Sequence, residues 1–207
     1  NSNCYYASIS NSNRHKNLDY IATVYNGINA EEFSFNEQPE DYLIFFGRIH
    51  PHKGTAEAIQ IAQQSQKRLK IVGIIQDEAY FKKEVEPFLN DDITFIGAAG
   101  PTQRNELLGK AAALLHPISF DEPFGLSVAE AMLCGTPVIA FNRGAMPELI
   151  KDKRTGFLVN NMKDAITSVT ELKSINRADC HQWALENFTT QKMVDDYLSI
   201  YHQILNK

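Results

Sequence analysis

The sequence predicts an α/β fold in which a Rossmann-like parallel sheet carries helices on both faces. Short apolar runs alternate with longer amphipathic runs from residue 40 onward, as in parallel strands joined by helices. The apolar runs end at glycines or polar loops, which is where open α/β sheets bind ligands. Of the 207 residues, 43% are hydrophobic and 22% are charged, a composition that allows a buried core.

The individual elements follow from the spacing of apolar residues. Parallel strands are predicted at residues 42–46, 69–72, 93–96, 113–116, 137–141 and 156–159. Helices are predicted between them at residues 53–65, 78–89, 102–112 and 126–133. From residue 162 onward we expect only helices, and the last of them has an apolar face formed by Val194, Tyr197, Leu198, Tyr201 and Leu205.

The first residues have the pattern of a different unit. Residues 4–10 and 23–29 are each predicted as strands, and the second runs into an Asn-Gly turn. No alternating partner strand follows closely, so we interpret this turn as part of a linker. We therefore expect residues 1–24 to be a remnant of another domain, residues 25–207 to form the main domain, and the chain to be a piece of a longer protein.

Composition and charge argue against several kinds of partner. The formal net charge of −5 gives no basic field that would attract nucleic acid. Cys4, Cys134 and Cys180 form no C-x-x-C pair, so neither a disulfide framework nor a thiolate zinc site is predicted. No apolar run approaches the roughly 18 residues of a membrane span, and the N-terminus lacks a signal-peptide pattern. We expect a cytoplasmic protein without a nucleic-acid partner.

The first group of candidate binding residues follows the first predicted strand of the main domain. Gly47 and Arg48 end that strand, and Lys53 lies five residues further on, where a helix is predicted to begin. A glycine permits close approach of an anion, arginine offers a fixed fork of donors, and lysine adds a mobile charge. The combination suits a diphosphate. The alternative is that both cations are ordinary solvated side chains.

The second group surrounds the predicted helix at residues 126–133. Glu122 precedes this helix and Glu130 lies about one turn inside it, so the two carboxylates bracket the anion-attracting amides of its N-terminus. Glu122 could instead cap this helix or complement its dipole. Glu130 lies on an apolar helix, and no Lys or Arg occurs between Glu122 and Asn142. We therefore expect Glu130 to lack a protein partner and to accept hydrogen bonds from ligand hydroxyls, although a structural carboxylate is the alternative.

These residues resemble a known family. Glu122 and Glu130 match the E-x7-E pattern of the retaining glycosyltransferases of family 4, whose GT-B architecture joins two Rossmann-like domains. Several further segments match the family in the same order: Gly47-Arg48, Lys53-Gly54, residues 25–29, the continuation through residues 130–140, Arg143-Gly144, Pro147-Glu148 and residues 155–159. The resemblance covers residues 25 to about 205 and implies the C-terminal, donor-binding domain.

The resemblance also implies roles for individual residues. Arg48 and Lys53 would hold the diphosphate of a nucleotide sugar, with Gly47 beside it, and Glu122 would contact the donor sugar. Glu130 would bind the ribose diol. The amides of three further residues would reach sugar hydroxyls and phosphate oxygens: Phe124, Gly125 and Leu126. The nucleobase would lie against the loop after residue 96, whose site residues are Gly97, Ala98, Ala99 and the nearby Arg104.

The implied reaction is glycosyl transfer with retention at the anomeric carbon, in which Arg48 and Lys53 stabilise the leaving diphosphate and Glu122 completes the catalytic set. The acceptor would be the hydroxyl of a glycan, a lipid-linked sugar or another molecule, as in polysaccharide biosynthesis. The resemblance implies an N-terminal domain that binds this acceptor and receives the final helix, peripheral membrane association of the full-length protein, and no activity for this chain alone. No cofactor or metal is expected, because the sequence contains no D-x-D motif.

Other functions remain open at this stage. A sugar-nucleotide epimerase or a phosphorylase shares the two-domain fold, but neither carries this ordered set of motifs. A non-catalytic nucleotide-sensing module would have the same donor-binding motifs. A dinucleotide oxidoreductase is disfavoured because no G-x-G-x-x-G follows a predicted strand.

Overall fold

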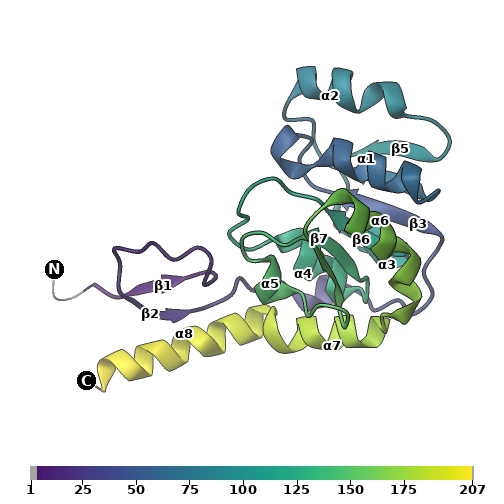
Figure 1. Cartoon of the computed structure of the whole chain (residues 1–207). Coiled ribbons are helices and arrows are strands. Elements are labelled where there is room, and N and C mark those ends of the chain that lie inside the picture. Colours follow the sequence, from purple (N-terminus) through teal and green to yellow (C-terminus); the bar gives the residue numbers. More distant parts are fainter. Residues whose placement is uncertain (1–3, 207) are drawn as a thin grey trace.

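A six-stranded parallel sheet forms the centre of the protein, in a computed structural model that describes residues 4–206 (Figure 1). From one edge to the other, its strands are β5 (Ile93–Gly97), β4 (Arg68–Val72), β3 (Tyr42–Phe46), β6 (Ala113–His116), β7 (Val138–Phe141) and β8 (Gly156–Val159). This confirms the predicted fold class, and each predicted strand of the main domain is present with small differences at its ends.

Strands β3 and β6 lie side by side at the middle of the sheet. Their register pairs Leu43 with Ala113 and Phe45 with Leu115, and these side chains are fully or almost fully buried. The chain then continues from β3 to β4 and β5 on one side, and from β6 to β7 and β8 on the other. The strand order therefore reverses between β3 and β6, which creates a crevice at their carboxyl ends.

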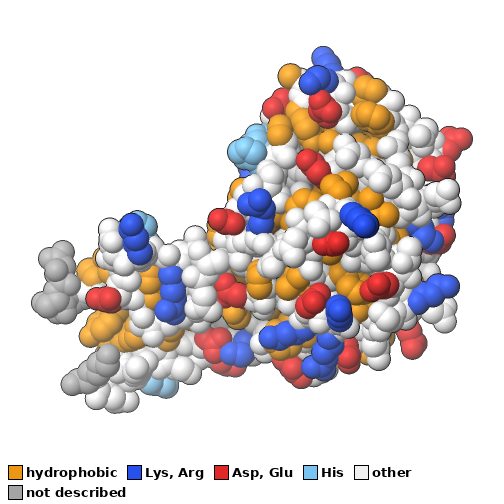
Figure 2. All heavy atoms as spheres, in the orientation of Figure 1, with side chains coloured by type: hydrophobic (Ala, Val, Ile, Leu, Met, Phe, Trp, Pro, Cys, Tyr) orange, Lys and Arg blue, Asp and Glu red, His pale blue; other side chains and the backbone are white. Residues whose placement is uncertain are grey.

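The helices form two groups that flank the sheet. Helix α1 packs against α6, and helix α4 packs against α3 and α7. The bounds are α1 (Thr55–Gln64), α2 (Glu78–Glu84), α3 (Pro101–Lys110), α4 (Leu126–Leu133), α5 (Met146–Leu149), α6 (Met162–Glu171), α7 (Arg177–Asn187) and α8 (Thr190–Leu205). Charged side chains of both signs are interspersed over the face shown in Figure 2. Within residues 4–206, none of the helices combines the length and apolar character needed to cross a membrane.

The helix predicted at residues 78–89 is shorter than expected. Helix α2 ends at Glu84, and a separate 3₁₀ turn follows at Glu86–Phe88. Pro87 explains the break, because proline has no backbone N–H and its ring clashes with the carbonyl four residues earlier.

The segment at residues 23–29 is not the strand that the sequence predicts. A small parallel sheet joins β1 (Tyr6–Ser8) to β2 (Tyr20–Thr23), apart from the main sheet in Figure 1. Ile28 then bonds to the junction of α7 and α8, where its N–H donates to the Phe188 carbonyl at 2.8 Å and its carbonyl accepts from Thr190 N–H at 2.9 Å. The prediction failed because these distant backbone groups, rather than a neighbouring strand, pair with the extended segment.

One carboxylate attaches the N-terminal segment to the main domain. Glu148 on α5 accepts hydrogen bonds from the backbone N–H groups of Asn11 and Ser12, at 2.8 and 2.9 Å, and from the Tyr25 hydroxyl at 3.1 Å. Burial, together with the charge of Glu148, raises the pKa of Tyr25 to about 12, so this hydroxyl keeps its proton. These bonds place Ile9 beside the crevice at the end of β3 and β6.

Helix α8 presents much of its predicted apolar face to solvent. Four residues of this face are exposed: Val194, Leu198, Tyr201 and Leu205. Ile200 is the residue of this helix that is buried.

Helices in proteins are stabilised mainly by packing of an apolar face. We therefore expect amides in residues 194–205 to exchange with solvent faster than those of β3 and β6 in a hydrogen-exchange experiment. Equal protection of α8 and the central strands, in a sample shown to be monomeric, would contradict this expectation.

Candidate functional site

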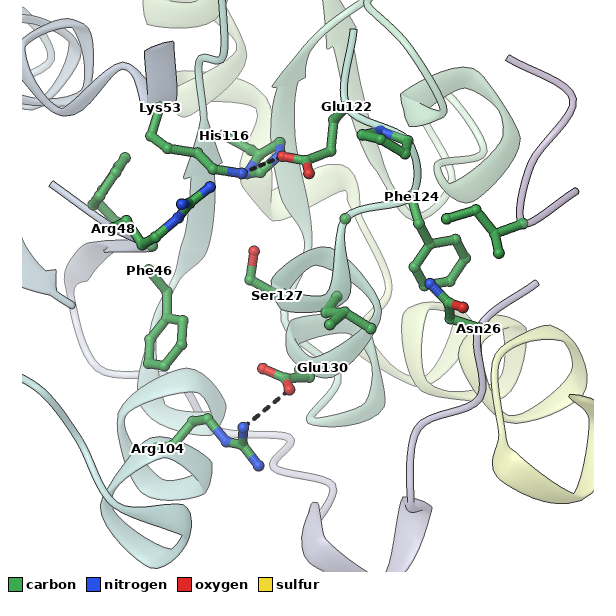
Figure 3. A pocket seen from close by; sticks show the side chains of 16 residues that line it. Asn26, Phe46, Arg48, Lys53, Arg104, His116, Glu122, Phe124, Ser127 and Glu130 are labelled. Atoms are coloured by element: carbon green, nitrogen blue, oxygen red, sulfur yellow. Dashed lines mark hydrogen bonds and ion pairs between the residues drawn. The ribbon is translucent and has the colours of Figure 1, made fainter. Parts of the chain in front are cut away.

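A cavity of about 410 Å³ lies at the carboxyl ends of β3 and β6, where the strand order reverses (Figure 3). Residues from both halves of the sheet line it, together with the first turn of α4 and the N-terminal segment. The lining residues are Ile9, Asn26, Phe45, Phe46, Gly47, Arg48, Lys53, Arg104, His116, Glu122, Pro123, Phe124, Gly125, Leu126, Ser127 and Glu130. The structure therefore brings together nine of the twelve residues predicted for the site.

Lys53 reaches the cavity because Gly54 packs directly against the loop that follows β6. Gly54 adopts a left-handed conformation (φ 79°), and a Cβ atom there would lie 2.0 Å from the carbonyl oxygen of Pro117. Any other residue would push these two segments apart. The contact brings Lys53, which precedes Gly54, next to the loop that carries Glu122.

Lys53 and Glu122 form an ion pair across the cavity (Figure 3). Only 16% and 15% of their side chains are exposed, and Lys53 Nζ also lies 4.8 Å from the centre of the Phe120 ring. The Glu122 backbone is held from the other side by Gly144 (φ 53°), where a Cβ would come within 2.4 Å of the Glu122 N and O atoms. The description of an ordinary solvated cation therefore does not fit Lys53.

Arg48 differs from Lys53 in its surroundings. Its side chain is exposed at the rim of the cavity and points toward the Lys53–Glu122 pair in Figure 3. Among residues 4–206, no carboxylate lies within ion-pair distance of Arg48. The guanidinium is therefore available to a bound anion without first breaking an ion pair.

Helix α4 begins at the cavity without a side-chain cap. Gly125 is its N-cap residue, with φ 106°, and no side chain bonds to the first-turn amides. This rules out a capping role for Glu122. Uncapped N–H groups at a helix N-terminus attract anions, because the orphan donors and the helix dipole act in the same direction.

Glu130 has a protein partner, contrary to the sequence-based expectation. Arg104 of α3 donates from Nη1 to Glu130 Oε1 at 3.1 Å and from Nη2 to Glu32 Oε2 at 3.2 Å. The absence of nearby basic residues in the sequence was misleading because the partner comes from another helix. Burial nevertheless raises the pKa of Glu130, since the desolvation of the carboxylate outweighs the attraction of Arg104.

The expected nucleobase residues Gly97 and Ala99 do not line the cavity, and neither does Ala98. Gly97 is the last residue of β5, and Ala98 and Ala99 follow it. β5 is the edge strand and is separated from β3 by β4. Ala99 packs against the apolar core instead. Arg104, which was predicted to lie near the base, does line the cavity, but its guanidinium bonds to Glu130 and Glu32.

The sequence interpretation missed His116, which ends β6 at the floor of the cavity. Its side chain is buried, its Nε2 atom has no hydrogen-bond partner, and this atom lies 3.9 Å from Glu122 Oε2. Burial, assisted by the charge of Lys53, lowers the pKa of His116 to about 3. Its position at the end of a central strand was a usable signal. Asn26, Phe46 and Ser127 were missed as well.

The arrangement suits a ligand that carries both negative charge and hydroxyl groups. Arg48, Lys53 and the N-terminus of α4 supply positive potential, whereas the carboxylates of Glu122 and Glu130 can accept hydrogen bonds. Within residues 4–206, no group of three or more His, Cys, Asp or Glu side chains is placed to hold a metal ion.

Comparison with known proteins identifies the family. Residues 27–184 match the family model described as "Glycosyl transferases group 1". The chain belongs to this family. Arg48, Lys53, Glu122 and Glu130 all lie within the matched region, whereas Ile9 and Asn26, which also line the cavity, precede it.

The chain is similar to several curated glycosyltransferases but covers less than half of each of the two described here. It is 31% identical over 168 residues to D-inositol 3-phosphate glycosyltransferase of Streptomyces scabiei, a match that covers 68% of this chain and 37% of that protein. It is 29% identical over 161 residues to the O-antigen chain mannosyltransferase RfbU of Salmonella typhimurium, covering 76% of this chain and 44% of that one.

Solved structures show the same fold. AviGT4, a glycosyltransferase involved in avilamycin A biosynthesis, has a TM-score of 0.82 and 23% identity, and the match covers 97% of this chain and 63% of AviGT4. Anabaena HepE, solved in complex with UDP-glucose, has a TM-score of 0.75 and 21% identity over 93% of this chain and 63% of HepE. The central sheet and its surrounding helices are therefore one Rossmann-like half of a GT-B architecture.

A Glu130→Gln substitution tests whether this carboxylate serves a ligand. The change keeps the shape, removes a desolvated charge and leaves Arg104 bonded to Glu32, so we expect the melting temperature to stay the same or rise slightly. Affinity for a nucleoside diphosphate should fall by about 1.5 to 3 kcal/mol, the loss expected for a hydrogen bond to a charged acceptor. Differential scanning fluorimetry and isothermal titration calorimetry give the two quantities.

Glu32→Gln is the matched control, because Glu32 bonds to the same Arg104 but does not line the cavity. It should leave nucleotide affinity unchanged. Lowered stability of Glu130→Gln with unchanged affinity would mean that Glu130 is a structural carboxylate.

His116 predicts a pH dependence of stability. The unfolded chain binds a proton at this side chain near pH 6.5, whereas the folded protein does so only near pH 3. The contribution of His116 to the free energy of unfolding is therefore complete above pH 6.5 and is lost as the pH falls toward 3. Between pH 7.5 and pH 5, the free energy of unfolding of the wild type should fall by about 2 kcal/mol more than that of His116→Gln, as measured by urea unfolding. An unchanged difference between the two proteins would contradict this.

Proposed function

We propose that this chain is the nucleotide-sugar-binding domain of a retaining glycosyltransferase of family 4, and that it forms the C-terminal half of a two-domain GT-B enzyme. The observation that carries the proposal is the cavity itself, which combines two cations and an uncapped helix N-terminus with two carboxylates, in a chain of the group 1 family. The similarity of the fold to HepE, solved with UDP-glucose, supports the choice of ligand.

The positions of the side chains suggest how a donor would lie. The diphosphate would lie between Arg48, Lys53 and the amides at the start of α4, where positive potential is concentrated. Glu130 is one helical turn further along α4 and would accept hydrogen bonds from the ribose diol. Glu122, at the opposite end of the cavity, would then face the sugar.

The chemical step would be the exchange of two bonds at the anomeric carbon. The bond from this carbon to the diphosphate oxygen breaks, a bond to the acceptor oxygen forms on the same face, and the acceptor proton passes to the leaving phosphate. Arg48 and Lys53 would stabilise the negative charge that develops on the diphosphate, which is electrostatic catalysis by groups already in place. This reaction requires no resident cofactor or metal ion.

The acceptor would be bound outside the residues described. The curated relatives are much longer than the segment they share with this chain, which spans 37% and 44% of the two enzymes described above. We therefore assign the acceptor hydroxyl to the remaining part of such an enzyme, which in a GT-B architecture lies across the cleft from the donor.

Binding of nucleoside diphosphates tests the proposal. Thermal shift and titration calorimetry should compare three nucleoside diphosphates, UDP, GDP and ADP. The corresponding nucleotide sugars, UDP-glucose, GDP-mannose and ADP-glucose, should be measured in the same way. The diphosphate that carries the preferred base should stabilise the fold. At a concentration of 100 times its Kd, a ligand adds about 2.7 kcal/mol to the free energy of unfolding. Lys53→Met should weaken this binding by about tenfold or more, as expected for loss of a charge-assisted hydrogen bond.

Lys83→Met is the matched control, because Lys83 is 82% exposed on α2 and does not line the cavity. It should bind the nucleotide as the wild type does. The absence of any shift with all three diphosphates, or equal effects of the two lysine substitutions, would refute the proposed donor site. Nucleotide binding without transfer by a full-length enzyme that contains this chain would favour a sensing module.

A further inference from the structure

The buried side chain of His116 has a polar atom without a partner. His116 is 5% exposed, and its Nε2 makes no hydrogen bond although it lines a cavity that is otherwise rich in polar partners. Buried polar atoms in proteins are almost always hydrogen-bonded, so an unsatisfied one calls for an explanation. The pocket wall offers one acceptor near this atom, Glu122 Oε2, at 3.9 Å.

In the free protein, that acceptor is already engaged by a cation. The same oxygen, Glu122 Oε2, forms the ion pair with Lys53 Nζ. Its distance from His116 Nε2 is 3.9 Å, which is longer than the upper limit of about 3.2 Å for an N–H···O hydrogen bond. Lys53 and His116 therefore both lie near one carboxylate oxygen, and Lys53 is paired with it (Figure 3).

A bound diphosphate would change this balance. Lys53 is the cation that the proposed function assigns to the diphosphate, whose multiple negative charges attract it more strongly than one carboxylate does. Glu122 is only 15% exposed, and a carboxylate at that depth is destabilised when it loses its partner. His116 lies close to this carboxylate, and because burial lowers the pKa of its ring, the ring is neutral at neutral pH and has one N–H to donate.

We propose that His116 is a positioning residue that takes over Glu122 Oε2 when the donor diphosphate draws Lys53 away. This inference rests on the proposed function and extends it. A shift of less than about 1 Å would bring Nε2–H within hydrogen-bond distance of the carboxylate. Glu122 would then stay fixed in orientation and could accept hydrogen bonds from hydroxyls of the donor sugar. His116 thus supports recognition of the sugar and contributes little to recognition of the nucleotide.

A purely structural His116 makes a different prediction. If the ring only fills space at the end of β6, its replacement lowers stability and weakens all ligands in the cavity alike. The two roles are therefore separated by the ratio of two dissociation constants, one for a nucleoside diphosphate and one for the same diphosphate carrying its sugar.

The experiment uses His116→Leu, which removes the donor, and His116→Gln, whose amide N–H extends about as far as Nε2. Dissociation constants are measured by calorimetry for UDP and UDP-glucose, GDP and GDP-mannose, and ADP and ADP-glucose, with melting temperatures to confirm folding. The sugar contribution is the ratio of the Kd of the nucleoside diphosphate to the Kd of the corresponding nucleotide sugar. In His116→Leu, this ratio should fall about tenfold or more, the loss expected for one hydrogen bond to a charged acceptor. Affinity for the bare diphosphate should stay within about threefold. His116→Gln should restore most of the gain.

A second measurement on the unaltered protein does not depend on how the variants fold. Ring ¹⁵N chemical shifts of His116 should show the proton on Nε2 in the nucleotide-sugar complex. A proton on Nδ1 in that complex would overturn the inference, as would equal weakening of both ligands by His116→Leu or failure of His116→Gln to restore the sugar contribution. Wild-type protein that binds none of the three diphosphates would overturn the proposed function, and this inference with it.

Discussion

The contact between β3 and β6 determines where this protein can bind anything. These two strands are hydrogen-bonded neighbours, yet the chain leaves them toward opposite edges of the sheet. Their following loops therefore diverge and leave a crevice that no crossover helix fills. Gly54 lets its backbone pack against Pro117 on one side of this crevice, and Gly144 packs against the Glu122 backbone on the other. At both positions a side chain would keep the two backbone segments further apart. The ion pair of Lys53 with Glu122 is a result of these two contacts.

The free protein keeps its site polar by pairing each buried carboxylate with a cation. Glu122 is paired with Lys53, and Glu130 with Arg104. A ligand that brings its own charges and hydroxyls must exchange partners with these pairs rather than simply fill an empty space. Such an exchange favours ligands that satisfy every group they disturb, because a buried charge left alone is strongly destabilising. If the cavity binds a nucleotide sugar as proposed, this exchange would disfavour molecules that supply phosphate without hydroxyls, or hydroxyls without phosphate.

The sequence predicts the sheet and most of the cavity but not its internal pairing. Apolar runs mark the strands, and the rule that parallel strands direct their carboxyl ends to one edge brings Arg48 and Glu122 together before any coordinates are known. Arg104 was not predicted to reach Glu130, because the contact depends on the angle between two helices, which periodicity does not define. The same holds for Glu148, whose partners Asn11 and Tyr25 lie more than 120 positions earlier in the chain.

Helix α4 also sets how this part of the sequence can change. Glu130 enters the cavity because it lies four residues after Leu126, the first residue of the helix, close to one full turn of 3.6 residues. Inserting or deleting a single residue between Gly125 and Glu130 would rotate the carboxylate by about 100° around the helix axis and shift it by about 1.5 Å along it. Glu130 would then point away from the cavity. Every residue of α4 from Val128 to Leu133 is buried, so both the length of this helix up to Glu130 and most of its side chains are tightly constrained.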